Sequence, residues 1–167
     1  MLPQTITIRP AQATDAAAAC QVLRRSISQC CTLDHQDDAT LLANWLANKT
    51  EANTRHWIAS SGLALVAENE AGIVGFANCA SDGELRLLYL LPETRFTGTG
   101  KALLQAIETW AIAAGLKQLT LDSTITAHDF YLRNGFLNQG TASKYQGMPN
   151  FLMTKQLETI SCKQTQN

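Results

Sequence analysis

The sequence has no long apolar run and no excess of charge of one sign, and each absence excludes a class of protein. No stretch approaches the roughly 18 apolar residues that a membrane-spanning helix needs, and no basic segment followed by an apolar run opens the chain. The 13 basic and 14 acidic residues give a formal net charge of −1, so no overall field favours nucleic acid or an anionic membrane surface. We therefore expect a cytoplasmic protein that binds neither nucleic acid nor membrane. Any anion site must be local.

The cysteines also lack a pattern. They are odd in number and have no Cys-x-x-Cys spacing, which argues against a disulfide framework and a structural zinc site. We expect reduced thiols at Cys20, Cys30, Cys31, Cys79 and Cys162. The histidines His35 and His56 show no metal-ligand spacing with the nearby aspartates, so the sequence predicts no metal site.

At 167 residues the chain is long enough to bury a core without staples, and it contains no internal repeat, low-complexity tract or linker. The simplest organisation is one domain over 1–157. Residues 158–167 are polar and are expected to fray.

Hydrophobic periodicity predicts the order of the elements. Strands are expected over 5–9, 63–68, 73–79, 84–91, 119–122, 136–145 and 151–157. Helices are expected from Thr14 or Asp15, over 38–47, from Gly98 to Gly115, and from a cap at Thr126 with Asp129 to Asn134-Gly135. Turn residues 69–72 and 147–149 predict two antiparallel hairpins. This order describes an α/β fold with a mixed, mostly antiparallel sheet and helices on both faces.

The segment Arg95-Phe96-Thr97-Gly98-Thr99-Gly100-Lys101 is the most informative motif. It leads from an apolar strand into an amphipathic helix through a glycine-bearing turn. Such a turn leaves several backbone N–H groups unpaired and points them, with the positive end of the helix dipole, at one place. The motif therefore predicts a phosphate site, to which Arg95 and Lys101 can add positive charge.

The pattern Arg-x-x-Gly-x-Gly, with Leu88-Tyr89-Leu90-Leu91-Pro92 before it, resembles the acetyl-CoA pyrophosphate loop of the GNAT superfamily of N-acetyltransferases. Downstream, the segment 130–136, Phe-Tyr-Leu-Arg-Asn-Gly-Phe, is similar to the aromatic-Tyr-x-x-x-Gly-Phe signature of that superfamily. The resemblance covers about 6–157, although 30–56 matches nothing specific. It implies the GNAT fold and direct transfer of the acetyl group of acetyl-CoA to a primary amine.

The resemblance also implies roles for individual residues. The pyrophosphate would be held by the amides of 96–101, and pantetheine would lie along Leu88, Tyr89 and Leu90. The strand that carries them is implied to splay from its neighbour after Leu90, leaving the Leu90 N–H free for the thioester oxygen. Tyr131 is implied to donate a proton to the departing thiolate. Thr124 stands where many members have an asparagine that contacts pantetheine, and its hydroxyl can partly replace that amide.

Glu84 lies six residues before Leu90, so strand periodicity places both on one face and makes Glu84 the candidate general base. Arg86 is expected on the same face. An ion pair with Arg86 would lower the pKa of Glu84 and weaken it as a base, so a solvated glutamate is an equal alternative. Arg86 would otherwise suit a substrate carboxylate. His128, one helical turn before Tyr131, is expected to be an exposed side chain rather than a cofactor contact.

Two other functions are compatible with parts of this pattern. A GNAT-like domain can bind an acyl-CoA without catalysis and act as a sensor or interaction module. A nucleotide-binding P-loop is disfavoured because Lys101 is followed by Ala102 instead of Ser or Thr. The acceptor, a small-molecule or peptide amine, is not specified by the sequence. The family resemblance implies a homodimer.

Overall fold

A computed structural model describes residues 4–140 and 142–158 of the chain. Most of the predicted polar tail, from residue 159 on and including Cys162, lies outside the described residues.

The first sheet is antiparallel and has the strand order β1-β2-β3-β4. Its strands are β1 (Thr7–Pro10), β2 (Leu63–Asn69), β3 (Gly72–Cys79) and β4 (Leu85–Leu90). The predicted hairpin at 69–72 is confirmed, with Asn69 facing Gly72. The side-chain oxygen of Asn69 accepts a hydrogen bond from the Ala71 N–H at 2.9 Å, and Gly72 adopts a φ of 121°.

The second sheet is built from the C-terminal part of the chain. Its central strand β8 (Met148–Gln156) pairs with β5 (Gln118–Ser123), β6 (Leu137–Asn138) and β7 (Ser143–Tyr145), all antiparallel. The last turn differs from the prediction. It lies at Gln146-Gly147, whose φ values of 49° and 84° are both positive as a two-residue hairpin requires, so Met148 and Pro149 belong to the strand.

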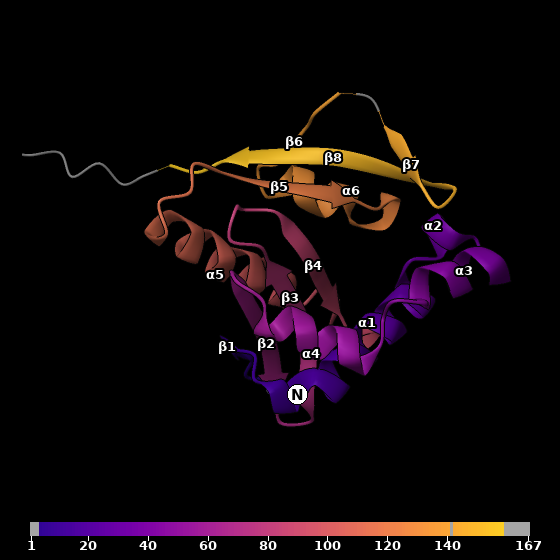
Figure 1. Ribbon diagram of the computed structural model, residues 1–167, viewed down its shortest axis with the longest axis horizontal. Coiled ribbons are helices and arrows are strands. Elements are labelled where there is room, and N and C mark those ends of the chain that lie inside the picture. Colours follow the sequence, from indigo (N-terminus) through magenta and orange to yellow (C-terminus); the bar gives the residue numbers. More distant parts are fainter. Residues whose placement is uncertain (1–3, 141, 159–167) are drawn as a thin grey trace, which may run out of the picture.

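In the part of the chain that the structure describes, the two sheets meet at a single parallel bridge between Glu84 and Thr120. The Thr120 N–H donates to the Gly83 carbonyl oxygen at 3.0 Å beside it. Beyond this point β4 and β5 diverge (Figure 1). The predicted α/β class with antiparallel pairing is confirmed, and this divergence opens earlier than the expected position after Leu90.

Six α-helices are present in the described residues. They are α1 (Ala16–Cys30), α2 (Thr32–His35), α3 (Ala39–Leu46), α4 (Glu51–Ala59), α5 (Thr99–Ala113) and α6 (Ile125–Arg133). Short 3-10 turns, η1 (Ala13–Asp15) and η2 (Pro92–Thr94), precede α1 and follow β4. Helices α2 and α4 were not predicted. Thr54 is the buried residue of α4. This helix has only a weak apolar stripe, so hydrophobic periodicity did not predict it.

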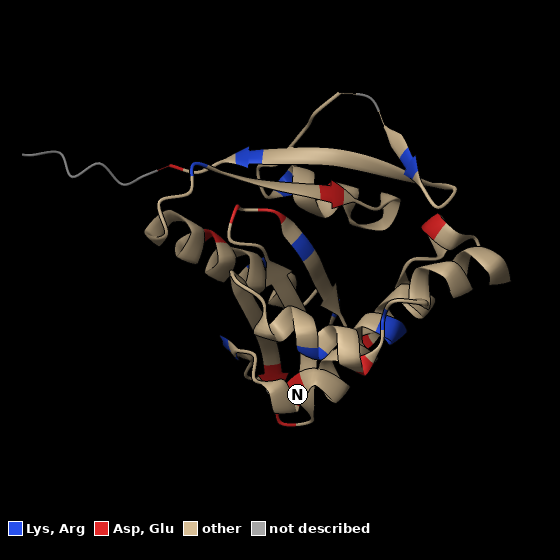
Figure 2. Cartoon of the chain, in the orientation of Figure 1, with Lys and Arg blue, Asp and Glu red and all other residues tan. Residues whose placement is uncertain are grey.

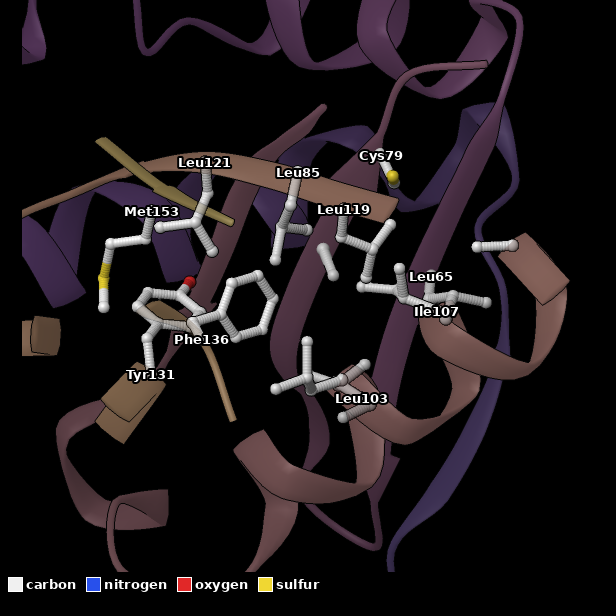
Figure 3. Close-up of a cluster of buried hydrophobic side chains, with 14 of the residues drawn as sticks. Leu65, Cys79, Leu85, Leu103, Ile107, Leu119, Leu121, Tyr131, Phe136 and Met153 are labelled. Atoms are coloured by element: carbon white, nitrogen blue, oxygen red, sulfur yellow. The ribbon is translucent and has the colours of Figure 1, made fainter. Parts of the chain in front are cut away.

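The main core lies between α5 and the two sheets (Figure 3). Leu103, Leu104 and Ile107 of α5 are almost fully buried, and they are joined by Met153 of β8 and by Phe136, which directly precedes β6. A second cluster, with Leu23 and Phe76, packs α1 on the opposite face of the first sheet. The helices therefore cover both faces, as predicted.

The caps of two helices differ from the prediction. The Asp15 carboxylate does not cap α1; it accepts hydrogen bonds from the Arg9 guanidinium at 2.8 and 3.0 Å. The N-cap of α6 is Thr124, whose hydroxyl oxygen accepts from the Ala127 N–H at 3.1 Å, rather than Thr126. Helix α6 therefore begins directly after β5, which brings its side chains to the edge where the sheets diverge.

Candidate active site

A β-bulge in β4 sets the faces of its side chains. Asn78 pairs with Leu87, whereas Cys79 pairs with Leu85, so Arg86 is the extra residue. Leu85, Leu88 and Leu90 consequently all pack with the α5 cluster, although Leu85 and Leu88 are three positions apart.

The outer edge of β4 carries backbone amides that face the gap. The Leu91 N–H donates to the Val74 carbonyl oxygen of β3 at 2.8 Å. Hydrogen bonding alternates along an antiparallel pair, so the N–H groups of Leu88 and Leu90 point away from β3 toward the diverging β5. They are placed to donate to a ligand in the gap.

The glycine-bearing turn after β4 has the open geometry that the sequence predicted. Phe96 and Gly98 both have positive φ, 63° and 87°, and Gly98 is the N-cap of α5. The first hydrogen bond of α5 runs from the Ala102 N–H to the Gly98 carbonyl oxygen at 3.0 Å. The N–H groups of 99–101 therefore have no acceptor within the helix and can donate to an anion. A Cβ at Gly98 would meet nothing within 4 Å, so the turn opens onto free space.

A cleft of about 770 Å³ lies along this edge, within the size range of small-molecule sites. It brings together most of the predicted residues, which line it: Leu88, Tyr89, Leu90, Arg95, Phe96, Gly98, Gly100, Lys101, Thr124 and Tyr131. Thr97 and Thr99 do not line it. Their hydroxyl oxygens lie 2.9 Å apart, and the Thr97 hydroxyl donates to the Thr94 carbonyl oxygen at 2.6 Å. These two side chains therefore stabilise the turn by hydrogen bonds within it.

The charges at the cleft are predominantly positive. Arg95, Lys101 and Arg133 line it together with Asp129. Elsewhere acidic and basic residues are interspersed along the ribbon (Figure 2). The near-neutral chain thus has a local site that suits an anionic ligand.

Tyr131 lies at the inner wall of the cleft and is only 6% exposed. Its ring makes edge-to-face contacts with Phe130 and Phe136, at centroid distances of 5.2 and 5.4 Å. Burial raises the pKa of the phenol above its ordinary value, so the hydroxyl stays protonated at neutral pH.

Glu84 is not among the residues that line the cleft. The expectation that it shares a face with Leu90 is wrong, because the bulge at Arg86 changes the alternation between them. Its carboxylate lies 3.7 Å from the Arg86 guanidinium, with both side chains about half exposed. The base role of Glu84 stays a prediction.

Sequence reasoning missed the wall opposite α6. Ser26, Cys30 and Cys31 line the cleft from the end of α1, and the two cysteines begin the segment 30–56 that matched nothing specific. Burial raises the pKa of the Cys31 thiol to about 12, so this cysteine is a protonated, small apolar wall residue. Asn134 also lines the cleft and was not predicted. It lies three residues after Tyr131, so helical spacing could have placed it on the same side of α6.

The three tryptophans and His128 pack outside the cleft, and His128 is less exposed than the sequence predicted. His128 is half-buried outside the cleft lining, with its ring 4.5 Å from that of Phe151 and its Nε2 2.8 Å from the Asn138 side-chain oxygen. Trp45 is buried, and Trp57 and Trp110 are half-buried against the two sheet-facing clusters. Among the described helices, none is long and apolar enough to cross a membrane.

The diverging strands, the glycine turn and the buried tyrosine define a GNAT-type acyltransferase site. A family profile of the acetyltransferase (GNAT) domain matches residues 31–157. The chain belongs to the GNAT acetyltransferase family, and the predicted family and fold are confirmed.

Solved structures of the family superpose over nearly the whole chain. A GCN5-related N-acetyltransferase from Rhodopseudomonas palustris has a TM-score of 0.82 and 27% identity, covering 94% of this chain and 99% of that one. The PaiA N-acetyltransferase from Thermoplasma acidophilum, solved in complex with coenzyme A, has a TM-score of 0.76 and 23% identity, covering 91% and 99%.

A curated relative matches a shorter region. The amino-acid acetyltransferase of Ralstonia nicotianae is 41% identical over 56 residues, which are 34% of this chain and 12% of that protein. The match therefore spans about an eighth of that relative's length.

Proposed function

We propose that the protein transfers the acetyl group of acetyl-CoA to a primary amine by direct attack, without a covalent acetyl-enzyme. The observation that carries the proposal is the 770 Å³ cleft, in which the glycine turn, the outward amides of β4 and Tyr131 line one space. The complex of the Thermoplasma acidophilum PaiA enzyme with coenzyme A supports the choice of ligand.

The residues at the turn fit a nucleotide diphosphate. Gly98 leaves open space where a side chain would stand, and a Cβ at Gly100 would already touch Leu90 and Phe130 at 3.5 Å. Arg95 and Lys101 line the cleft at the positive end of the α5 dipole. We assign the diphosphate to the amides of 99–101 and to these two cations.

We assign the binding of the acetyl thioester to residues of β4 and α6. Acetyl-CoA supplies an activated acetyl thioester. The N–H groups of Leu88 and Leu90 can hold its carbonyl oxygen, where negative charge develops as the amine attacks. As the C–S bond breaks, the Tyr131 hydroxyl, kept protonated by burial, donates its proton to the departing sulfur, and the proton that the attacking amine loses passes to solvent, from which the tyrosine is reprotonated. Thr124 caps α6 through its side-chain oxygen and lines the cleft beside the place of pantetheine.

The proposal is tested by a thiol-release assay with acetyl-CoA and a panel of primary amines, beside calorimetric titration with acetyl-CoA. We expect turnover with one acceptor class. Tyr131→Phe keeps both ring contacts and removes only the hydroxyl, so we expect kcat to fall about a hundredfold while the Kd for CoA stays within twofold. Absence of acetyl-CoA binding would refute the assignment of the cleft.

The position of Glu84 favours one alternative. A carboxylate outside the cleft lining and beside Arg86 is not placed to deprotonate an amine, as expected of an acyl-CoA sensor without catalysis. Tight binding of acetyl-CoA without turnover on any amine of the panel would support the sensor. Turnover would exclude it.

We also propose a cytoplasmic location, one catalytic domain over 1–157 and, as the family resemblance implies, a homodimer. Four free, buried cysteines, Cys20, Cys30, Cys31 and Cys79, are compatible with a reducing compartment. Cell fractionation and light scattering at several protein concentrations test the location and the dimer.

A further inference from the structure

A buried carboxylate joins the two walls of the cleft at one end. Asp34, in α2, is 3% exposed, and its two oxygens accept from the start of α6, about ninety residues away in sequence. The Ile125 N–H donates to Oδ1 at 2.7 Å. The Thr126 hydroxyl donates to Oδ2 at 2.6 Å, and the Thr126 N–H donates to the same oxygen at 3.3 Å.

Each partner of this bridge lies next to residues that line the cleft. Cys30 and Cys31 directly precede α2 and line one wall, and Thr126 and Ala127 line the other. The bridge therefore fixes the distance between the α1 wall and the wall that carries Tyr131.

The α2 side of the bridge is itself held in place. His35 is fully buried, and its Nδ1 accepts from the Asp37 N–H at 3.1 Å. The other ring nitrogen, Nε2, is then the protonated one and donates to the Ile27 carbonyl oxygen at 3.0 Å. Asp34 thus projects from a turn that is anchored to α1 at its neighbouring residue.

The α6 side is the element whose orientation the proposed chemistry needs. Tyr131 lies less than two helical turns after Thr126 on a helix of nine residues, and its position is set by how that short helix is seated. An anion at the helix N-terminus holds the helix by charge–dipole attraction as well as by hydrogen bonds. A displacement of about 1 Å at a reacting group can cost a hundredfold in rate.

We propose that Asp34 is a positioning residue for acetyl transfer, which seats α6 so that Tyr131 faces the thioester and sets the width of the cleft for the acceptor. This inference rests on the proposed function of the same cleft. Asp34 does not line the cleft and acts only through α6.

The chain provides a matched control. Asp38 also accepts from the first amides of a helix, but as the N-cap of its own helix α3: its Oδ1 accepts from the Thr40 and Leu41 N–H groups at 2.9 and 3.0 Å, and it is exposed and lies outside the cleft. Asp34→Ala and Asp38→Ala each remove a carboxylate from a helix N-terminus. Only the first breaks the link between the walls.

The experiment measures steady-state kinetics and amide hydrogen exchange for the wild type, Asp34→Ala, Asp34→Asn, Thr126→Val and Asp38→Ala. For Asp34→Ala we expect kcat to fall at least tenfold, the KM for the acceptor to rise at least threefold, and the KM for acetyl-CoA to stay within threefold. The KM for acetyl-CoA should change least because most of the contacts assigned to the cofactor belong to β4 and to the glycine turn before α5. Amide exchange over residues 125–131 should accelerate at least tenfold, with α5 unchanged.

The conservative variants keep the test valid where Asp34→Ala folds poorly. Asp34→Asn retains an acceptor for the Ile125 N–H, and Thr126→Val retains both backbone bonds, so both should show smaller losses of the same kind. Equal kinetics in Asp34→Ala and Asp38→Ala, or unchanged α6 exchange in every Asp34 variant, would overturn the proposal. A wild type without turnover would refute the proposed function and with it the role of Asp34 in acetyl transfer, and the exchange data would then show only whether Asp34 seats α6.

Discussion

Gly98 and Gly115 lie at the two ends of α5 and provide a matched pair for testing the phosphate site. Both have a positive φ, 87° and 80°, and a Cβ at either position would meet nothing within 4 Å. Replacing each with alanine therefore imposes the same backbone penalty without a steric clash. Only Gly98 lines the cleft.

The penalty follows from backbone sterics. Holding alanine in the left-handed region costs about 1–2 kcal/mol. In a domain of this size, 1 kcal/mol lowers Tm by about 2–4 °C, so each variant should melt about 2–8 °C below the wild type. Scanning calorimetry checks that the two shifts are alike.

Binding should separate the two variants. In Gly98→Ala a methyl group would stand in the open space of the turn, or the turn would leave its left-handed conformation and misdirect the amides of 99–101. We expect the Kd for CoA to rise at least tenfold, about 1.4 kcal/mol, and Gly115→Ala to bind like the wild type. Titration calorimetry measures both values. Equal affinities in the two variants would refute the assignment of this turn to the diphosphate.

Other predictions concern the base, the tyrosines and one crowded turn. Glu84→Gln should change kcat less than threefold because the carboxylate lies beside Arg86 outside the cleft lining, whereas a hundredfold loss in the same assay would establish it as the base. Burial raises the pKa of Tyr89 and Tyr131, so both keep their protons in the folded state after the unfolded chain has lost them near pH 10. The free energy of unfolding should therefore be unaffected by these two groups below that pH and should fall above it, by about 2.7 kcal/mol per pH unit for the pair. Urea titrations from about pH 9 to 11 would detect this fall, and a free energy of unfolding that does not change with pH would contradict it. In Gly62→Ala the new Cβ would overlap a backbone carbonyl oxygen at a φ of 109°, so we expect the variant to be insoluble or unfolded by circular dichroism, and a native spectrum with an unchanged Tm would contradict the packing described for this turn.

Local sequence signals predicted the elements that local chemistry determines. The hairpin between β2 and β3 follows from Asn69 and Gly72, and the turn into α5 follows from Gly98, because these residues favour their conformations wherever the chain places them. The same signals located most of the cofactor wall. Tyr131 was placed by its motif and by the helix that the pattern predicted.

Features that depend on distant partners were not predictable. The bulge at Arg86 arises from pairing with β3, and it moved Glu84 off the face that strict alternation assigned. The contact of Asp34 with α6 joins positions about ninety residues apart and has no signature in either segment. Helix α4 is amphipathic only weakly, so periodicity did not reveal it.

The strands of the two sheets come from separate parts of the chain, one ending at Leu90 and the other beginning at Gln118, and in the described residues one β-bridge, between Glu84 and Thr120, joins them. A ligand in the cleft between them would contact both parts at once and add to the shared core and the few backbone bonds that hold the two sheets together. Binding of the ligand then raises the free energy of unfolding of the whole molecule. A ligand concentration of a hundred times Kd adds about 2.7 kcal/mol, which is more than a surface ion pair is expected to contribute. When the ligand dissociates, we expect local opening to occur first at the contact between the two sheets, while the strands within each sheet stay paired.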